Sequence, residues 1–206
     1  ILGSLDLLRL GKEGLSDSQT ELVDLVTRGA RRLAALVTDI LALSRLEHGK
    51  VDLKLEPVPL SDIVEQIRSR LPVAQRHRVL MDGRPRLLAA ADPVKLTEIL
   101  ENLVSNALKY SSEPVEVSVR HRKDRLMVEI VDHGIGIRPR DRAHLFEKFF
   151  RAADTHVQGL EGSGLGLTIA RHLAELHGGR LTFRSRWKKG TTFILELPAW
   201  RGPARA

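Results

Sequence analysis

The 206-residue sequence contains no cysteine, and aromatic side chains make up only 4% of it. The absence of cysteine excludes disulfide scaffolds, thiolate metal sites and cysteine nucleophiles. No apolar run is long enough to span a bilayer, and no segment resembles a signal peptide. We therefore expect a soluble, cytoplasmic chain, which is compatible with its being the soluble part of a larger, membrane-bound protein.

The chain is basic, with a formal net charge of +7, but its arginines are scattered along the sequence. The densest basic cluster lies at residues 120–125, within a predicted hairpin tip. Few aromatic side chains are available to stack on bases, and charge alone is a weak sign of nucleic-acid binding. We expect no direct nucleic-acid partner. The hydrophobic content of 42% is sufficient for a real core.

The first part of the chain has the pattern of a helical hairpin. Residues 1–10 have an apolar helical pattern, and a longer helix is predicted over residues 18–48. A helix of that length is about 45 Å long, too long to be covered by the short helix before it. We expect two copies of this hairpin to form a dimeric four-helix bundle. The alternative is that the long helix packs on the second domain of its own chain. Its apolar stripe contains Val26, Ala30, Leu33, Val37 and Ile40.

After Gly49 the sequence alternates between strand and helix patterns. Such an arrangement after one helical hairpin predicts an α+β fold, a two-layer sandwich with helices on one face of a sheet. We expect a helical domain over residues 1–48, an α+β domain over 49–200 and a short tail over 201–206. The predicted strands are 51–56, 78–81, 87–90, 114–120, 125–131, 180–186 and 191–197, and the predicted helices are 59–75, 92–110, 139–146 and 164–177.

One predicted helix carries a row of polar side chains beside its apolar face. Glu98, Asn102 and Asn106 are spaced four residues apart, which places them on one side of the helix. A carboxamide can hold a cation through its oxygen and a phosphate through its nitrogen, and a glutamate can accept a proton or hold a water. A merely solvated polar stripe is the alternative.

Three glycine-containing segments suggest a nucleotide site. Asp132 ends an apolar strand, and the glycines after it allow a flat ligand to approach the backbone, so its carboxylate can accept a hydrogen bond from an amine such as that of adenine. Residues 162–167 lead directly into a helix, where backbone N–H groups can face phosphate. This segment lacks the lysine of a Walker loop. A further strand begins at Gly190 and Thr191. Each segment alone is compatible with an ordinary turn or surface loop.

Taken in order, these segments resemble the ATP-binding domain of sensor histidine kinases, the GHKL fold. The similarity runs from about residue 49 to residue 198, and five motifs in order are far more specific than any one of them. Residues 98–111 are similar to the asparagine box, 132–137 to the first glycine box, 145–151 to the phenylalanine box, 162–167 to the second glycine box and 190–191 to the third.

The resemblance implies ATP and magnesium (Mg2+) as cofactors and assigns roles to residues. Asn102 would hold the metal, and Glu98 and Arg151 would be catalytic, acting on the attacking imidazole and the terminal phosphate. Residues 138–163 would form a mobile lid anchored by Phe146 and Phe149. The implied ATP-binding residues are Asn102, Asn106, Lys109, Tyr110, Asp132, Gly134, Gly136, Ile137, Gly162, Gly164, Leu165, Gly166, Leu167 and Thr191.

The implied activity is ATP-dependent transfer of phosphate to a histidine of the dimerisation helix and then to the receiver domain of a response regulator. The implied partners are therefore a second copy of the chain and that regulator. None of the eight histidines has the sequence context of the family's acceptor, a histidine followed by an acidic residue early in the first helix. No phospho-acceptor is therefore assigned. The resemblance places it about three helical turns before Ile1, so autophosphorylation cannot be completed within this sequence.

Two other interpretations remain open. A GHKL ATPase can use ATP as a conformational clamp, as heat-shock chaperones and gyrase do, and a binding module can retain the fold with an inactive pocket. The helical hairpin and the phenylalanine box favour the kinase.

Overall fold

The computed structural model describes residues 16–82, 87–152 and 162–202, and begins with the long helix α2, Asp17–Glu47. Ser16 and Gln19 form a capping box at its start, and the chain leaves the helix at Gly49, which has a φ of 63°. The predicted helix is confirmed within one residue at each end. The predicted first helix, residues 1–10, lies outside the described residues.

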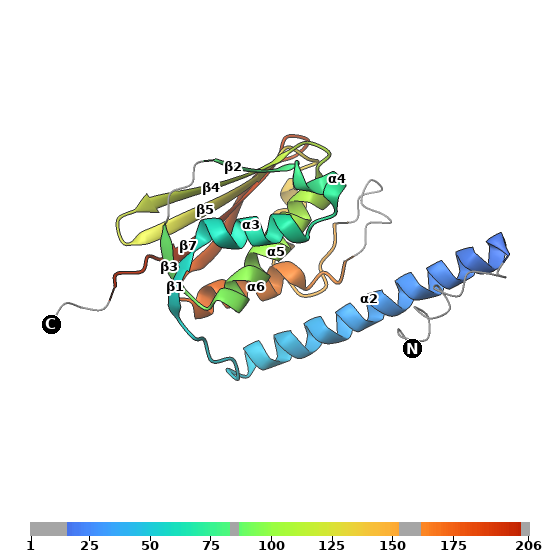
Figure 1. Cartoon of the computed structure of the whole chain (residues 1–206), viewed down its shortest axis with the longest axis horizontal. Coiled ribbons are helices and arrows are strands. Elements are labelled where there is room, and N and C mark those ends of the chain that lie inside the picture. The colour runs from blue at the N-terminus through green and yellow to red at the C-terminus, as the bar shows by residue number, and fades with distance from the viewer. Residues whose placement is uncertain (1–15, 83–86, 153–161, 203–206) are drawn as a thin grey trace.

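Helix α2 extends beyond the rest of the structure, and only its C-terminal end joins the core (Figure 1). Leu43 and Leu46 are buried there, and the Lys148 ammonium forms an ion pair with Glu47. Between its N-terminus and this contact the helix leaves seven large apolar side chains between 47% and 64% exposed. These residues are Leu22, Leu25, Val26, Leu33, Val37, Ile40 and Leu41. Among the described helices, none is long and apolar enough to cross a membrane.

The main sheet has five strands in the order β2-β4-β5-β7-β6. Strand β2 pairs parallel to β4, and the other neighbours pair antiparallel. Two further strands, β1 and β3, form a separate antiparallel pair. The strands are β1 Glu56–Pro59, β2 Val79–Asp82, β3 Leu88–Ala91, β4 Val115–Arg122, β5 Arg125–Asp132, β6 Arg180–Arg186 and β7 Gly190–Pro198.

Three helices cover one face of this sheet (Figure 1). They are α3 Leu60–Arg70, α5 Pro93–Tyr110 and α6 Gly166–Leu176, and two short helical segments, α4 Val73–Arg76 and η1 Pro139–His144, lie between larger elements. The core lies between this helical layer and the sheet, where the apolar face of α5 is fully buried. The predicted α+β two-layer sandwich is confirmed.

Three predicted elements were wrong in their bounds. Residues 51–55 are not a strand, and the first strand of the domain begins only at Glu56. The predicted helix over 59–75 ends at Arg70, because Leu71 precedes a proline and adopts an extended ψ of 152°. The segment at 139–146 is a 3₁₀ helix that ends at His144.

The polar helix α5 is fixed at its start by a cap with several donors. The Asp92 carboxylate accepts hydrogen bonds from the backbone N–H groups of Val94, Lys95 and Lys54. Burial acts to raise the pKa of Asp92, but these donors together lower it below its ordinary value. The backbone N–H of Asp92 donates to Nε2 of His177, which is buried at the end of α6. This contact ties α5 to α6 and so sets the spacing of the two helices that border the site.

Candidate nucleotide-binding site

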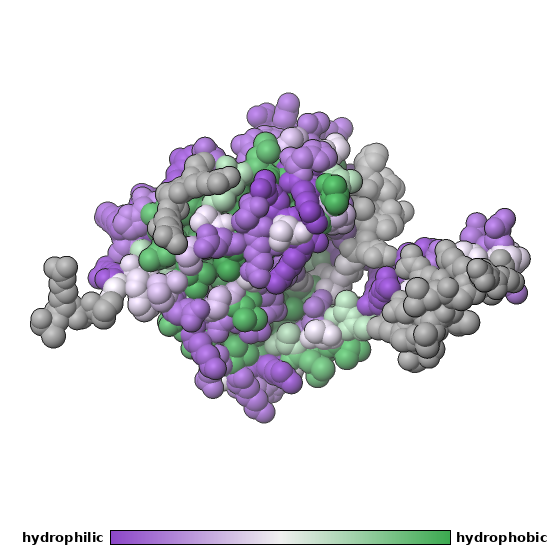
Figure 2. Space-filling model, in the orientation of Figure 1, coloured by the Kyte–Doolittle hydropathy of each residue, from purple (hydrophilic) through white to green (hydrophobic). Residues whose placement is uncertain are grey.

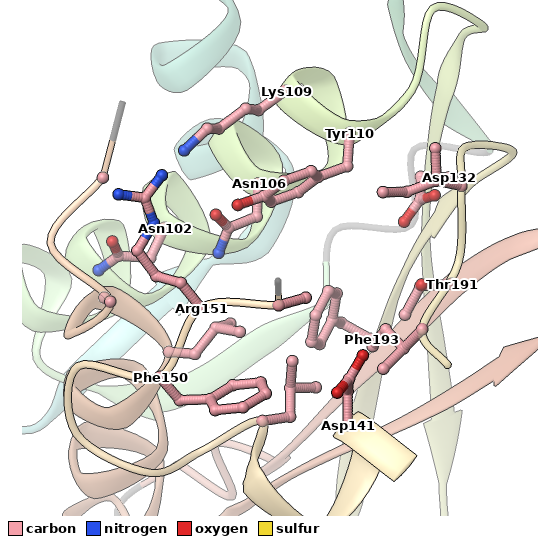
Figure 3. A pocket seen from close by; sticks show the side chains of 18 of the residues that line it. Asn102, Asn106, Lys109, Tyr110, Asp132, Asp141, Phe150, Arg151, Thr191 and Phe193 are labelled. Carbon is pink, nitrogen blue, oxygen red and sulfur yellow. The ribbon is translucent and has the colours of Figure 1, made fainter. Parts of the chain in front are cut away.

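A cavity opens between α5, the end of β5, η1 with the loop after it, and the start of α6. Figure 3 shows side chains from these elements pointing toward one another across the opening. Asp132 and Thr191 lie at one end of it, whereas Asn102, Asn106, Lys109 and Arg151 lie together at the other. The cavity therefore has two chemically different ends.

The first end is built around a buried carboxylate. Asp132 is only 5% exposed, and its Oδ1 accepts a hydrogen bond from the Gly134 backbone N–H at 2.9 Å. The backbone N–H of Thr191, the register partner of Asp132 on β7, also donates to this carboxylate. Burial raises the pKa of Asp132 although both hydrogen bonds and the nearby His133 act to lower it. A carboxylate held in this way is an acceptor for a donor group of a ligand.

The second end collects amides and cations. The Asn102 Nδ2 donates to the backbone carbonyl of Glu98 at 3.0 Å, which orients its carboxamide oxygen toward the start of α6. A Cβ on Gly166 would lie 2.6 Å from that oxygen, and a Cβ on Gly162 would lie 2.9 Å from Nζ of Lys109. The two glycines therefore let the α5 side chains approach the backbone at the α6 N-terminus, where N–H groups and the helix dipole favour an anion.

Two other glycines keep the walls of the cavity in place. A Cβ on Gly134 would lie 1.9 Å from the backbone oxygen of Tyr110, so only glycine fits where the loop after β5 crosses the end of α5. Gly164 has a φ of 75° and packs on the backbone of Phe149. The same neighbourhood buries the Tyr110 phenol, which raises its pKa, while Arg151 acts to lower it.

The segment after η1 is anchored by Phe146 rather than Phe149. The Phe146 ring packs edge-on against Phe183 with centroids 5.8 Å apart, and its backbone oxygen accepts from the Thr168 hydroxyl. Phe149, expected to be the second anchor, is 57% exposed, and it is Phe150 that lines the cavity. Part of the expected lid, residues 153–161, lies outside the described residues.

Most of the predicted site residues meet at this cavity. Asn102, Asn106, Lys109, Tyr110, Asp132, Gly136, Ile137, Arg151, Gly162, Gly164, Gly166, Leu167 and Thr191 line it. Gly134 and Leu165 do not; the first supports the wall, as described above, and the second is fully buried. Glu98 lies one turn before Asn102 and outside the cavity, where its carboxylate pairs with the Lys95 ammonium at 2.9 Å.

The cavity is also lined by residues that were not among the predicted ATP-binding or catalytic residues. The Arg138 guanidinium lies 4.6 Å from the ring centroid of Trp187, and both side chains border the opening. Trp187 comes from the β6–β7 turn, whose place beside the loop after β5 follows only from strand order. Asp39 reaches the cavity from α2, and its place there follows only from how α2 packs on the rest of the chain. Others are Ser105, Ile135, Asp141, Leu145, Phe150, Ala152, Ser163 and Phe193.

Comparison with known proteins gives consistent results. Residues 91–201 match the family model described as histidine kinase-, DNA gyrase B-, and HSP90-like ATPase. Residues 1–49 match the His Kinase A (phospho-acceptor) domain.

Two curated relatives and one solved structure illustrate the similarity. The signal transduction histidine-protein kinase AfsQ2 of Streptomyces coelicolor is 35% identical over 190 residues, which cover 91% of this chain and 35% of that protein. The sensor-like histidine kinase SenX3 of Mycobacterium tuberculosis is 37% identical over 175 residues, 82% of this chain and 43% of that protein. The crystal structure of full-length ShkA in complex with AMPPNP superimposes with a TM-score of 0.77 at 26% identity, covering 99% of this chain and 43% of that one.

The chain thus spans less than half the length of these relatives. The two family models, the sequence relatives and the shared fold all agree. The chain belongs to the sensor histidine kinases and carries their GHKL ATPase domain.

Proposed function

We propose that this chain is the catalytic part of a protein histidine kinase of a two-component system and binds ATP with magnesium in the cavity between α5 and α6. The observation that carries the proposal is the division of the cavity into a buried acceptor end at Asp132 and an amide and cation end at the α6 N-terminus. A purine with an exocyclic amine suits the first end, and a polyphosphate suits the second.

The residues at the second end also fit a magnesium ion bound to phosphate. Mg2+ prefers oxygen ligands and usually keeps several waters while bridging substrate phosphates. The Asn102 carboxamide oxygen would be the protein ligand, because its nitrogen is already committed to Glu98. The described part of the chain has no cluster of three carboxylate or imidazole groups that could hold a metal without a nucleotide. Asn106 and Lys109 would contact the phosphates.

The chain would then promote phosphoryl transfer by aligning the γ-phosphoryl group with the acceptor and neutralising the charge on it. The γ-phosphoryl group passes from ATP to an imidazole nitrogen of the acceptor histidine, and ADP leaves with the bond electrons. Arg151, at the edge of the cavity, would neutralise charge on the transferred group. Glu98 lies one turn of α5 before Asn102, on the side away from Asp132, where an incoming histidine would approach the phosphate. It would accept the imidazole proton once Lys95 is displaced.

The assembly that presents this histidine would be a homodimer. The exposed apolar stripe of α2 would pack against a second copy, forming the four-helix bundle that carries the acceptor. The phosphohistidine would then donate its phosphoryl group to the receiver domain of a response regulator. The catalytic part would lie in the cytoplasm.

Phosphorylation in trans tests this proposal. The chain is mixed with radiolabelled ATP, magnesium and a longer form of the protein that contains the acceptor histidine but has Asp132→Ala. We expect acid-labile, base-stable label on the longer form, and no label when the chain itself carries Asp132→Ala. ATP hydrolysis without transfer of label would contradict the kinase proposal and support an ATP-driven clamp instead.

A further inference from the structure

Ser185 on β6 connects two of the glycine segments through one hydroxyl group. Its Oγ accepts a hydrogen bond from the Ile137 backbone N–H at 2.8 Å, and lies 3.0 Å from the Gly190 carbonyl oxygen. It also lies 3.0 Å from the Thr191 hydroxyl oxygen. None of the sequence motifs includes Ser185, and it does not line the cavity itself.

The chemistry of these three contacts fixes the direction of each. A hydroxyl has one donor hydrogen and two acceptor lone pairs. Because a carbonyl oxygen can only accept, the Ser185 hydrogen goes to Gly190. Its two lone pairs then accept from Ile137 and Thr191. The Thr191 hydroxyl hydrogen is therefore directed at Ser185 and away from any ligand.

In this arrangement the two side chains at the buried end of the cavity, Asp132 and Thr191, present acceptors to a ligand. The Asp132 carboxylate already takes the backbone N–H of Thr191 and has further lone pairs to offer. Thr191, 6% exposed, lines the same end and offers oxygen lone pairs without a hydrogen. Figure 3 shows these two side chains close to each other at that end.

We propose that Ser185 is a specificity-determining residue that acts through Thr191 and selects adenine over guanine; this rests on the proposed function of the cavity. The adenine amino group brings two N–H donors to the acceptor pair. Guanine has a carbonyl oxygen at the corresponding position, which meets lone pairs of Asp132 and Thr191 and no hydrogen from either side chain. By holding the Thr191 hydrogen, Ser185 keeps that position closed to guanine.

Removing the Ser185 hydroxyl should relax the selection. In Ser185→Ala the Thr191 hydroxyl is free to rotate and donate to the guanine oxygen. The buried guanine oxygen then gains one hydrogen bond that it lacks in the wild type. The ratio of the dissociation constants for GTP and ATP should therefore fall about tenfold, mainly through tighter GTP binding. Ser185→Thr keeps a hydroxyl and should retain the wild-type ratio. Ser185→Cys, a near-isosteric replacement with a weak donor, should shift the ratio in the same direction as alanine.

The experiment is calorimetric titration of the wild type and each variant with ATP and with GTP, both with magnesium. A double-mutant cycle distinguishes positioning of the Thr191 hydroxyl from a general loosening of the loops that Ser185 connects. In a Thr191→Val background, Ser185→Ala should leave the GTP/ATP ratio of dissociation constants unchanged. An unchanged ratio in both Ser185→Ala and Ser185→Cys, or an equal effect in the Thr191→Val background, would overturn the inference. Absence of ATP binding by the wild type would overturn the proposed function and the inference with it, whereas ATP binding with an unaltered ratio rejects the inference alone.

Discussion

Asp132→Asn should separate the stability of the domain from its response to ATP. The carboxylate is buried, and its pKa is raised, so its charged form costs stability in the folded protein at neutral pH. An asparagine keeps an oxygen that can accept from the Gly134 and Thr191 backbone N–H groups. We therefore expect the nucleotide-free variant to be at least as stable as the wild type at pH 7.5.

The response to ATP should go the other way. A ligand at 100 times its dissociation constant stabilises the folded state by about 2.7 kcal/mol. For a domain of this size, that corresponds to a rise in melting temperature of roughly 5–10 °C. The introduced carboxamide would present an amide hydrogen to the adenine amine in place of one lone pair, so the variant should show little or no rise at the same ATP concentration.

Thermal unfolding followed by circular dichroism, with and without ATP and magnesium, measures both effects. Lowering the pH through the raised pKa of Asp132 protonates the wild type and removes the cost of the buried charge. The stability advantage of the variant should consequently narrow in acid. Asp52→Asn, which neutralises an exposed carboxylate, is the matched control and should behave as the wild type. A variant that is less stable without ATP yet fully stabilised by ATP would refute the reasoning.

Three further predictions concern the supports of the cavity. Gly166→Ala should weaken ATP binding about tenfold, because its Cβ would displace the Asn102 carboxamide oxygen 2.6 Å away. The control is Gly29→Ala, a helix substitution into open space, which should leave ATP binding unchanged. Calorimetric titration compares the two variants, and equal affinities for ATP would contradict the assigned role of Asn102. Asp92→Ala should reduce the free energy of unfolding by about 1–2 kcal/mol at neutral pH through loss of the α5 cap. Because the pKa of Asp92 is lowered in the folded state, its charge stabilises the fold above the unfolded pKa, and this stabilisation is lost as the pH falls through the folded pKa. Urea unfolding at several pH values should therefore show that the loss of unfolding free energy in Asp92→Ala becomes smaller in acid. A loss that stays the same at every pH would mean that the charge of Asp92 contributes nothing. Trp187→Ala should weaken ATP binding about threefold by removing the ring beside the Arg138 guanidinium, and a titration with unchanged affinity would show that this pair does not shape the site.

The local signals in the sequence were sufficient for the elements that carry the site. Asp92 followed by Pro93 is a helix start that depends only on neighbouring backbone groups, and the four-residue spacing of Asn102 and Asn106 fixes their common face. The strand end at Asp132 and the glycines that follow are likewise local. These positions required no knowledge of the strand order.

The remaining features depend on contacts between distant segments. Trp187, Ser185 and Asp39 reach the site or its support only because of how β6, β7 and α2 are placed. Phe150, and not the predicted Phe149, lines the cavity. Phe149 has a positive φ of 62° and is exposed, and no sequence pattern shows that backbone angle. Residues 51–55 alternate like a strand but have no partner strand among the described residues, and Lys54 donates its backbone N–H to the α5 cap instead.

Apolar side chains are visible along the part of α2 nearest the α+β sandwich, below a largely polar surface (Figure 2). The apolar side chains of α2 follow the periodicity that predicts a bundle, and they remain exposed in the single chain. The two helices therefore differ in how their apolar faces are covered. The apolar face of α5 is buried within its own chain, whereas α2 has an apolar face that its own chain leaves uncovered over the described residues.

The location of the nucleotide is the central claim, and chemical-shift mapping tests it most directly. The isotope-labelled chain is titrated with ATP and magnesium while the backbone amide signals are followed. Saturable shifts should concentrate at Gly134, Gly136 and Thr191 at one end and at Gly164 and Gly166 at the other. Shifts that fail to saturate, or that gather on the exposed face of α2, would contradict the assignment of this cavity to ATP.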